Sequence, residues 1–335
     1  MFKAKRLAFC ATLIILLAVV SPADVEKSNT LVNEAWKAWG ENNQSLVEAK
    51  FSAALKEDPA NTRASLGLYL LYEMQGKKRE AWAALKNILQ SKDKSSAYLP
   101  YLFAARLSSD LNNYLDDPQS GALALAESLT VSADPDGILK AIANQELANY
   151  YEQRGDLAKA ARYFQNLNAI KDWMLIGPFE NVSASGIEQA YLPETEFAPA
   201  QTYAAKNGIP ARWFAPAATK PDYWTEFTFY FPADDAIFYA NTFVYSPKKQ
   251  SVQLRVGTSG SVKVFLNDQQ LFECFDENNN DLDTYIVETE LQEGWNRVLI
   301  KSGYSEIKRC NFLLRVTDRG GEPIKDLQVS TEAKT

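Results

Sequence analysis

The sequence contains no histidine, so imidazole acid–base chemistry is excluded and carboxylates are the candidates for it. That composition excludes Ser-His-Asp and Cys-His catalysis and histidine-ligated zinc. A glycoside hydrolase needs only two carboxyl groups. Acidic residues that could form such a pair lie in Asp172–Phe197 and in the loop FDENNNDLD, Phe275–Asp283. No spacing singles out a pair, so we expect a protein that is not an enzyme, with a carboxylate-dependent hydrolase as an alternative.

The same acidic loop has oxygen atoms that suit calcium. Its acids are Asp276, Glu277, Asp281 and Asp283. The calcium-loop spacing fails, because Asp281 stands where glycine is required and Glu288 falls one residue late. We therefore expect no metal site and no cofactor, and a solvated polar connection, with calcium as the alternative.

Carbohydrate binding would need aromatic rings that stack on sugars and polar groups that bind hydroxyls. The alternative for each ring is packing in a core, because aromatic side chains bury large areas. The candidate ligand-binding residues are the aromatic Trp213, Phe214, Tyr223, Trp224 and Tyr304, with the polar Asn267, Asp268, Asp276, Asp281 and Asp283.

Residues 1–23 have the pattern of a secretory signal peptide. The basic start MFKAKR precedes an apolar run, Leu7–Val20, and Ser21 and Ala23 suit a cleavage site. The run is short for a membrane span, although an uncleaved anchor is the alternative. Cleavage lowers the basic residues from 35 to 32 against 42 acids, a net charge of −10. We expect a protein of the periplasm or cell exterior that binds no nucleic acid.

Two cysteines remain after such cleavage, Cys274 and Cys310. An even pair in an oxidising compartment predicts a disulfide. Two separate buried thiols are the alternative.

Residues 24–170 are rich in helix-forming residues and repeat with a shift of 34. The two clearest copies read YEMQGKKREAWAAL and YEQRGDLAKAARYF, in which Gly76 and Gly155 permit a tight turn between helices. Asn42 stands at that position in a first copy, and the stretch Ser91–Asp136 does not keep the period. The region resembles the tetratricopeptide repeat, which implies a surface that binds a protein segment or a scaffold for the next domain.

Residues 171–325 form the predicted sandwich domain, and after Pro210 the pattern changes to the period of two that is typical of half-buried strands. Runs such as SVQLRVG, SVKVFLN and CNFLLRVTD predict an antiparallel sandwich or jelly roll. Gly257–Gly260 and Asn267–Asp268 suit hairpin turns. DWMLIGPFEN predicts the first strand, and VSASGIEQAYLPETEF a connection across the sheet with Ile187 and Tyr191 as anchors. Residues 326–335 are a polar tail.

The segments WMLIGPFEN, GIEQAYLPE, VKVFLNDQQLF, LQEGWNRVLIK and FLLRVTDRGGEPI resemble the galactose-binding-like jelly roll of exported bacterial proteins. In one bacterial group that module follows tetratricopeptide-like helices and precedes a transglutaminase-like domain. The resemblance covers residues 30–325 and implies that the catalytic domain is absent here. We expect an exported scaffold or recognition protein that binds a protein or glycan partner, with a dedicated carbohydrate-binding protein as the alternative.

Overall fold

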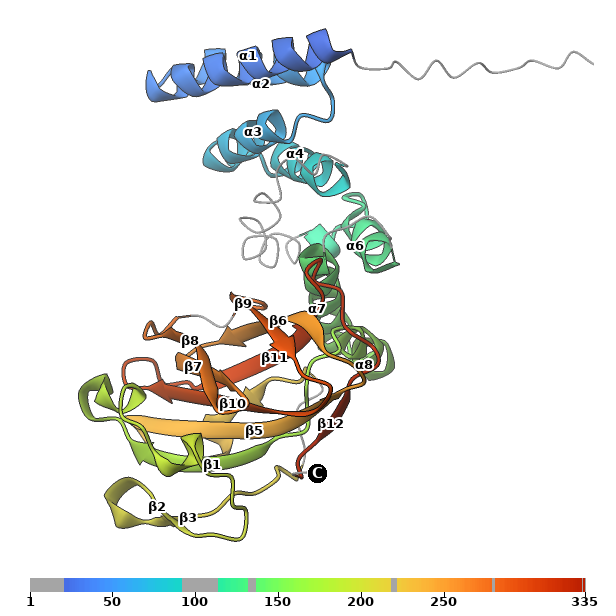
Figure 1. The fold of residues 1–335 in the computed structure, drawn as a ribbon. Coiled ribbons are helices and arrows are strands. Elements are labelled where there is room, and N and C mark those ends of the chain that lie inside the picture. The colour runs from blue at the N-terminus through green and yellow to red at the C-terminus, as the bar shows by residue number, and fades with distance from the viewer. Residues whose placement is uncertain are drawn as a thin grey trace, which may run out of the picture. The chain divides into compact units, whose positions relative to one another are not determined.

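The computed structural model describes residues 21–91, 114–131, 137–217, 222–278, 281–332 and 334. Helices come first and antiparallel sheets follow, which confirms the predicted class (Figure 1). The chain divides into two compact units, Met1–Ser96 and Ala97–Thr335. The second unit contains helices as well as the sheets, so it extends across the boundary expected at residue 170. Most of the expected signal peptide lies outside the described residues, among which no helix is both long and apolar enough to cross a membrane.

The helices are short and form antiparallel pairs. The first unit contains α1 (Pro22–Gly40), α2 (Gln44–Glu57), α3 (Thr62–Met74) and α4 (Lys78–Gln90). The second contains α6 (Ala122–Val131), α7 (Gly137–Gln153) and α8 (Leu157–Asn166).

The turn residues of the predicted repeat have the same backbone conformation in all three copies. Asn42, Gly76 and Gly155 have positive φ angles of 59°, 68° and 77°. Asparagine tolerates this left-handed conformation better than most residues, which explains why the first copy needs no glycine. The equivalent apolar positions after each turn are buried: Val47, Phe51 and Ala54 in α2, Ala81, Leu85 and Ile88 in α4, and Ala160, Phe164 and Leu167 in and after α8.

The structure also reveals a copy that the sequence analysis treats as aperiodic. Gly121, 34 residues before Gly155, has a φ of 69° and directly precedes α6. The Tyr72 hydroxyl of α3 donates to Glu48 of α2 at 3.2 Å, and the Tyr151 hydroxyl of α7 donates to Glu127 of α6 at 3.1 Å. Both pairs are separated by 24 residues. Helix α6 therefore corresponds to α2 of the first copy. The expected loss of the 34-residue period in Ser91–Asp136 is wrong for α6 and the turn before it.

The strands form two sheets of a sandwich with a shared apolar interior. One sheet has the order β1 (Met174–Glu180), β5 (Ala236–Ser246), β10 (Gly294–Tyr304), β7 (Ser261–Leu266), β8 (Gln269–Cys274), and β12 (Gln328–Ser330) pairs with β5. The other has the order β4 (Thr225–Glu226), β11 (Asn311–Thr317), β6 (Gln250–Thr258), β9 (Tyr285–Leu291). Smaller elements are β2 (Tyr203–Ala204), β3 (Pro210–Ala211), the 3₁₀ turns η1 (Val182–Ile187), η2 (Leu192–Glu194) and η3 (Lys206–Gly208), and α9 (Phe227–Tyr230).

The predicted strand faces are confirmed, but one predicted turn has another role. Val252, Leu254 and Val256 of β6 all face the shared interior. Asn267–Asp268 is the hairpin turn between β7 and β8, with φ angles of 50° and 67°. Gly257–Gly260, by contrast, leads from one sheet to the other, because β6 and β7 belong to different sheets. The expected hairpin there is wrong.

The resemblance drawn from LQEGWNRVLIK implies a hairpin at Gly294–Asn296, and this expectation is also wrong, since β9 and β10 lie in different sheets. The Asn296 side chain holds this crossing by accepting from the Gln292 backbone N–H at 2.9 Å and donating to its carbonyl at 2.8 Å. The motif therefore marks a passage between sheets rather than a hairpin.

The stretch Asp172–Phe197 forms the predicted first strand and a connection over the outer face of its sheet. Ile187 is buried and Tyr191 packs at the edge of a second apolar cluster that includes Phe179 and Tyr239. Both expected anchors are confirmed, and this connection gives the sheet a core on its outer side as well.

The expected disulfide is absent, because Cys274 and Cys310 are both free thiols. Cys274 ends β8 in one sheet and accepts a hydrogen bond from the Tyr285 hydroxyl at 3.1 Å. Cys310 precedes β11 in the other sheet and lies 3.3 Å from the Ser302 hydroxyl. Burial raises the pKa of the Cys310 thiol, as expected for an unreactive core cysteine.

Candidate functional site

Two of the aromatic candidates lie in the interior of the sandwich unit. Trp213 is 5% exposed and Trp224 is 7% exposed, so neither offers a free ring face to a sugar. Tyr304 is also buried, and Phe214 packs against the main core. Tyr223 is half-buried and lines a cavity, which makes it the candidate with an accessible ring.

The polar candidates do not converge on one point. Asn267 and Asp268 form a hairpin tip, where Asp268 pairs with Arg297. Asp276 and Asp281 are exposed on the acidic loop, whereas Asp283 is fully buried against two arginines. Among the described residues, no group of three or more acidic or cysteine side chains is placed to hold a metal.

Carboxylates of the connection Asp172–Phe197 take part in structural contacts. The Glu194 carboxylate accepts from Lys301 Nζ at 2.8 Å and from the Tyr239 hydroxyl at 2.6 Å. Lys301 Nζ also donates to the Gln189 carbonyl at 2.6 Å. Desolvation lowers the pKa of this fully buried lysine, and the bond to Glu194 opposes that shift. These contacts hold the connection onto the sheet.

A cavity of about 350 Å³ lies beside the linker that joins α8 to β1. Its volume falls in the range of about 300–1,000 Å³ that small-molecule sites occupy. The cavity is lined by residues from five separate segments, namely Gln165, Asn168, Ala169, Ile170, Lys171, Asp172, Tyr223, Val244, Val316, Leu327 and Val329. We take this cavity, hereafter the joint cavity, as the candidate functional site.

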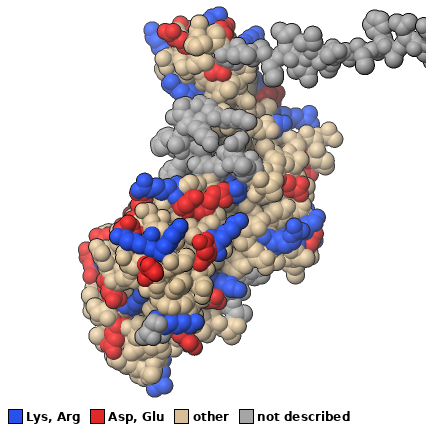
Figure 2. Space-filling model, turned by 45° about the vertical axis from the view of Figure 1, so that its right-hand side comes forward, with Lys and Arg blue, Asp and Glu red and all other residues tan. Residues whose placement is uncertain are grey.

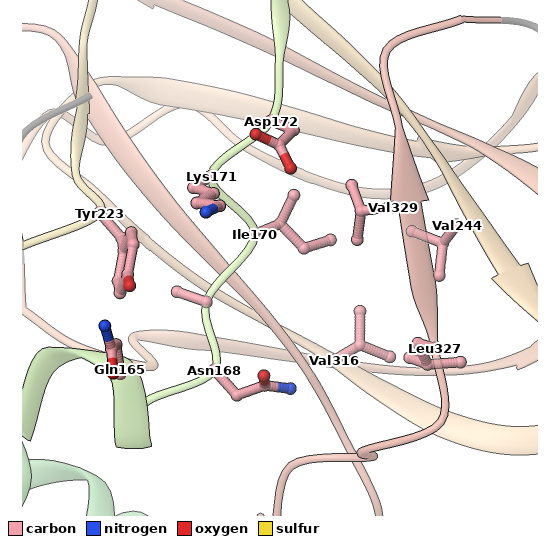
Figure 3. Close-up of a pocket in the computed structure, with 11 residues that line it drawn as sticks. Gln165, Asn168, Ile170, Lys171, Asp172, Tyr223, Val244, Val316, Leu327 and Val329 are labelled. Carbon is pink, nitrogen blue, oxygen red and sulfur yellow. The ribbon is translucent and has the colours of Figure 1, made fainter. Parts of the chain in front are cut away.

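The linker divides the lining of the joint cavity into two halves (Figure 3). Ile170 and Asp172 point to the side on which Val244, Val316, Leu327 and Val329 lie. Lys171 points to the opposite side, towards Tyr223 and Gln165. One half therefore combines the aliphatic side chains with the Asp172 carboxylate and the Asn168 amide, and the other contains Lys171, Tyr223 and Gln165.

Backbone pairing fixes the linker against both sheets. The Ile170 N–H donates to the Leu314 carbonyl of β11 at 2.8 Å. The Asp172 carbonyl accepts from the Thr242 hydroxyl of β5 at 2.8 Å, and the same hydroxyl lies 3.3 Å from the Ser330 carbonyl of β12. The linker thus passes from β11 in one sheet to β5 in the other, and the joint cavity lies beside this passage.

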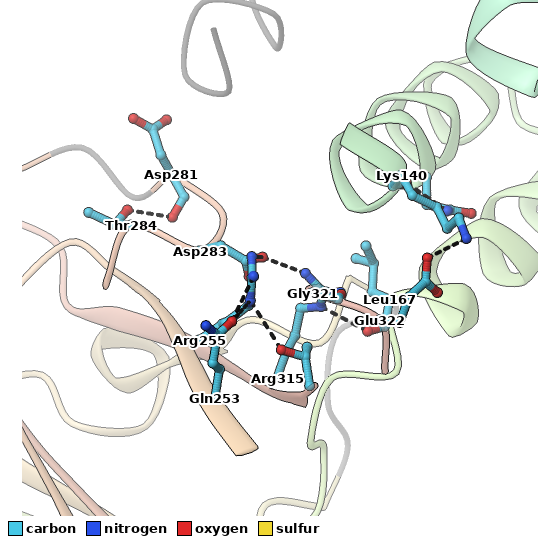
Figure 4. Close-up of polar contacts among 12 residues, drawn as sticks. Lys140, Leu167, Gln253, Arg255, Asp281, Asp283, Thr284, Arg315, Gly321 and Glu322 are labelled. Carbon is cyan, nitrogen blue, oxygen red and sulfur yellow. Dashed lines mark hydrogen bonds and ion pairs between the residues drawn. The ribbon is translucent and has the colours of Figure 1, made fainter. Parts of the chain in front are cut away.

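A buried charge cluster holds the end of α8 to the sandwich (Figure 4). Asp283 Oδ2 accepts from Arg315 Nη1 at 2.5 Å and from Arg255 Nη1 at 3.2 Å. Arg315 also donates to the carbonyls of Leu167 at 3.0 Å and Gly321 at 3.1 Å. Because Arg315 contacts both the sheet and the residue after α8, it sets where the linker begins.

Helix α7 is tied to the same corner. The Gly137 N–H donates to the Gly320 carbonyl at 2.9 Å, and Lys140 pairs with Glu322. A Cβ at Gly137 would lie 2.3 Å from the Gly321 carbonyl carbon, so only glycine allows this approach. Helices α7 and α8 therefore support the joint cavity as part of one unit with the sandwich.

Sequence reasoning finds one cavity residue, Tyr223, and misses the rest. The other lining residues come from segments far apart in the chain, so no short motif contains more than a few of them. The stretch Asn168–Asp172 reads NAIKD, which has no polar–apolar alternation, so no local pattern marked the cavity.

Comparison with known proteins adds no assignment: no family model matches the chain, and no curated protein matches it closely enough to establish a relationship. Charges of both signs mingle on the face of the molecule drawn in Figure 2, where no single-sign patch stands out.

Proposed function

We propose that the protein is an exported, non-enzymatic recognition protein and that the joint cavity binds part of a protein partner. The observation that carries this proposal is the composition of the cavity lining. Aliphatic side chains form its floor, and the rim has polar groups that form no ion pair within the described structure, namely the Lys171 ammonium and the Asp172 carboxylate. The cavity lining combines apolar and polar groups in similar measure, and binding sites commonly pair apolar surface with a few placed polar groups.

The aliphatic floor favours a polypeptide over a sugar as the main ligand. Val244 and Val316 are almost fully buried at the base of the cavity, and Leu327 and Val329 are partly buried above them. An apolar side chain inserted there would remove its own surface and the exposed parts of Leu327 and Val329 from water, at roughly 25 cal/mol per Å² of apolar area. Interfaces commonly depend on such an anchor residue in a pocket.

The helical repeats and the amino-terminal sequence support the rest of the proposal. Stacked helical pairs of this kind commonly present surfaces to protein partners, as the resemblance to tetratricopeptide repeats implies. Export rests on the basic and apolar residues before Ser21. The expected cleavage after Ala23 falls within the first turn of α1, where Ser21 and Asp24 form a capping box. Cleavage there would remove the Ser21 cap and shorten the helix.

A glycan is the second candidate ligand, and Tyr223 is the observation that favours it. Its ring lines the polar half of the joint cavity, next to Lys171 and Gln165. An aromatic ring with nearby amide and ammonium donors could bind a sugar face and its hydroxyls. Retention on immobilised polysaccharides that is lost in Tyr223→Ala would support this candidate, and equal retention of both proteins would exclude it at this site.

Photo-crosslinking tests the main proposal in the organism that makes the protein. A benzophenone amino acid replaces exposed Gln165 at the rim, and a matched control replaces Glu152, which is exposed on α7 outside the cavity. We expect one adduct of defined mass from position 165, none from position 152, and loss of the adduct when Val329→Phe fills the cavity. An adduct that persists in the Val329→Phe protein would contradict the proposal.

A further inference from the structure

We propose that the aliphatic half of the joint cavity takes an aliphatic group bearing a primary ammonium, such as the amino-terminal leucine of a peptide. This inference rests on the proposed function and specifies the ligand of the same site. It depends on which of the two charged lining residues faces the aliphatic floor.

The two charges of the described lining are separated by the linker. Asp172 points to the side of Val244 and Val329, whereas Lys171 points away from them (Figure 3). The charge presented to a ligand on the aliphatic floor is therefore negative. A cationic group beside that floor gains an ion pair, whereas an anionic group meets repulsion.

The position of Asp172 is fixed from both sides. Its own carbonyl accepts from the Thr242 hydroxyl at 2.8 Å. The next residue, Trp173, is 2% exposed, and its indole N–H donates to the Ile170 carbonyl at 3.0 Å. These bonds hold the backbone on each side of the carboxylate, so only the Asp172 side chain has to be ordered when a ligand binds.

The size of the cavity fits a branched aliphatic group with its ammonium. A volume of about 350 Å³ is far larger than the roughly 30 Å³ that one water molecule occupies in the liquid. The floor consists of branched side chains, Ile170, Val244, Val316, Leu327 and Val329. A leucine-like group matches them in polarity and leaves its ammonium at the rim, where Asp172 lies.

Such a ligand could be a free amine or the first residue of a polypeptide. Both have the same ammonium and aliphatic group, so the structure assigns the shared chemistry. Leucinamide represents the free amine and the tripeptide Leu-Ala-Ala represents a polypeptide terminus. N-acetylleucinamide has the same aliphatic group without the charge.

Isothermal titration calorimetry of the full chain with these three probes tests the inference. At about pH 6.5 the α-amino groups are protonated, since their pKa lies near 7.7–8.0. We expect leucinamide to bind about three- to fivefold more tightly than N-acetylleucinamide, which is the upper part of the range of an exposed ion pair. Tighter binding of Leu-Ala-Ala than of leucinamide would identify a polypeptide terminus, and the reverse a free amine.

The matched variants are Asp172→Asn and Lys171→Gln, which remove adjacent charges on opposite sides of the linker. We expect Asp172→Asn to abolish the preference for leucinamide and Lys171→Gln to retain it. Equal affinity of the charged and acetylated probes in the unaltered protein would overturn the inference while leaving the proposed function in place. Absence of binding by all three probes would also overturn it, and the crosslink from position 165 tests the proposed function separately.

Discussion

Replacing Asp283 with asparagine should destabilise the sandwich unit more than any comparable change on its surface. The carboxylate is buried and is the shared acceptor for Arg255 and Arg315, which are 4% and 1% exposed. Asparagine keeps the shape and one oxygen acceptor but removes the negative charge. The two guanidinium groups would then be buried next to each other without a counter-charge.

The expected magnitude follows from this geometry. Breaking a buried ion pair by neutralising one partner costs about 3–5 kcal/mol, because the remaining charge stays desolvated. Here two positive charges remain, and burial already lowers the pKa of Arg315. We therefore expect Asp283→Asn to reduce the free energy of unfolding of this unit by about 3–5 kcal/mol. Adding Arg255→Met should recover part of that loss, since it removes one of the unpaired charges.

Urea denaturation followed by tryptophan fluorescence measures the change, and Asp281→Asn is the control. Asp281 is exposed and lies two residues from Asp283. Partial desolvation of its carboxyl group raises the pKa of that group. We expect this control to alter the free energy of unfolding by less than about 0.5 kcal/mol, as surface substitutions usually do. A loss below about 1 kcal/mol in Asp283→Asn would refute the view that this cluster holds the helices to the sandwich.

Other expectations concern thiols, turns and pH. In a chain starting at Ser21, iodoacetamide should label Cys274 slowly and Cys310 only after denaturation; no labelling in denaturant would indicate a disulfide. Gly155→Ala should cost about 1–2 kcal/mol in a urea titration because of its positive φ, whereas Gly40→Ala should cost nothing; equal costs would contradict this. Burial raises the pKa of Tyr304 to about 12, so its contribution to stability should be full below pH 10 and lost between about 10 and 12. Tyr304→Phe should make the loss of stability between about pH 10 and 12 shallower. An unchanged loss in this variant would contradict the role of Tyr304.

Strand faces and repeat turns could be predicted because they depend on local periodicity. Val252, Leu254 and Val256 alternate with polar neighbours, which correctly places them on one face of β6. The expected half-burial of this strand is wrong, because Gln253 and Arg255 on its other face are buried as well. Gly76 and Gly155 mark turns because few other residues adopt positive φ without cost. In both cases the residues that carry the signal are close in sequence.

The sheet crossings and the joint cavity could not be predicted, because they depend on contacts between distant segments. Gly257 suits a hairpin by its residue type, but a Cβ there would lie 2.5 Å from the Asp281 carbonyl oxygen. The missing side chain at Gly257 allows Asp281 to pack closely where the chain crosses from one sheet to the other. Asp283 looks like a member of an exposed acidic loop. In the structure it has a φ of 54°, and its carboxylate pairs with Arg255 and Arg315. Neither arginine is near it in sequence.

The joint cavity as a binding site is the central claim, and methyl NMR spectroscopy with leucinamide tests it most directly. Val244, Val316 and Val329 provide reporter methyl groups on its floor. We expect saturable shifts of these methyl signals, little change at Val47 in the separate helical unit, and loss of the floor shifts when Val329→Phe fills the cavity. Shifts concentrated outside the floor, or floor shifts that survive Val329→Phe, would contradict the account.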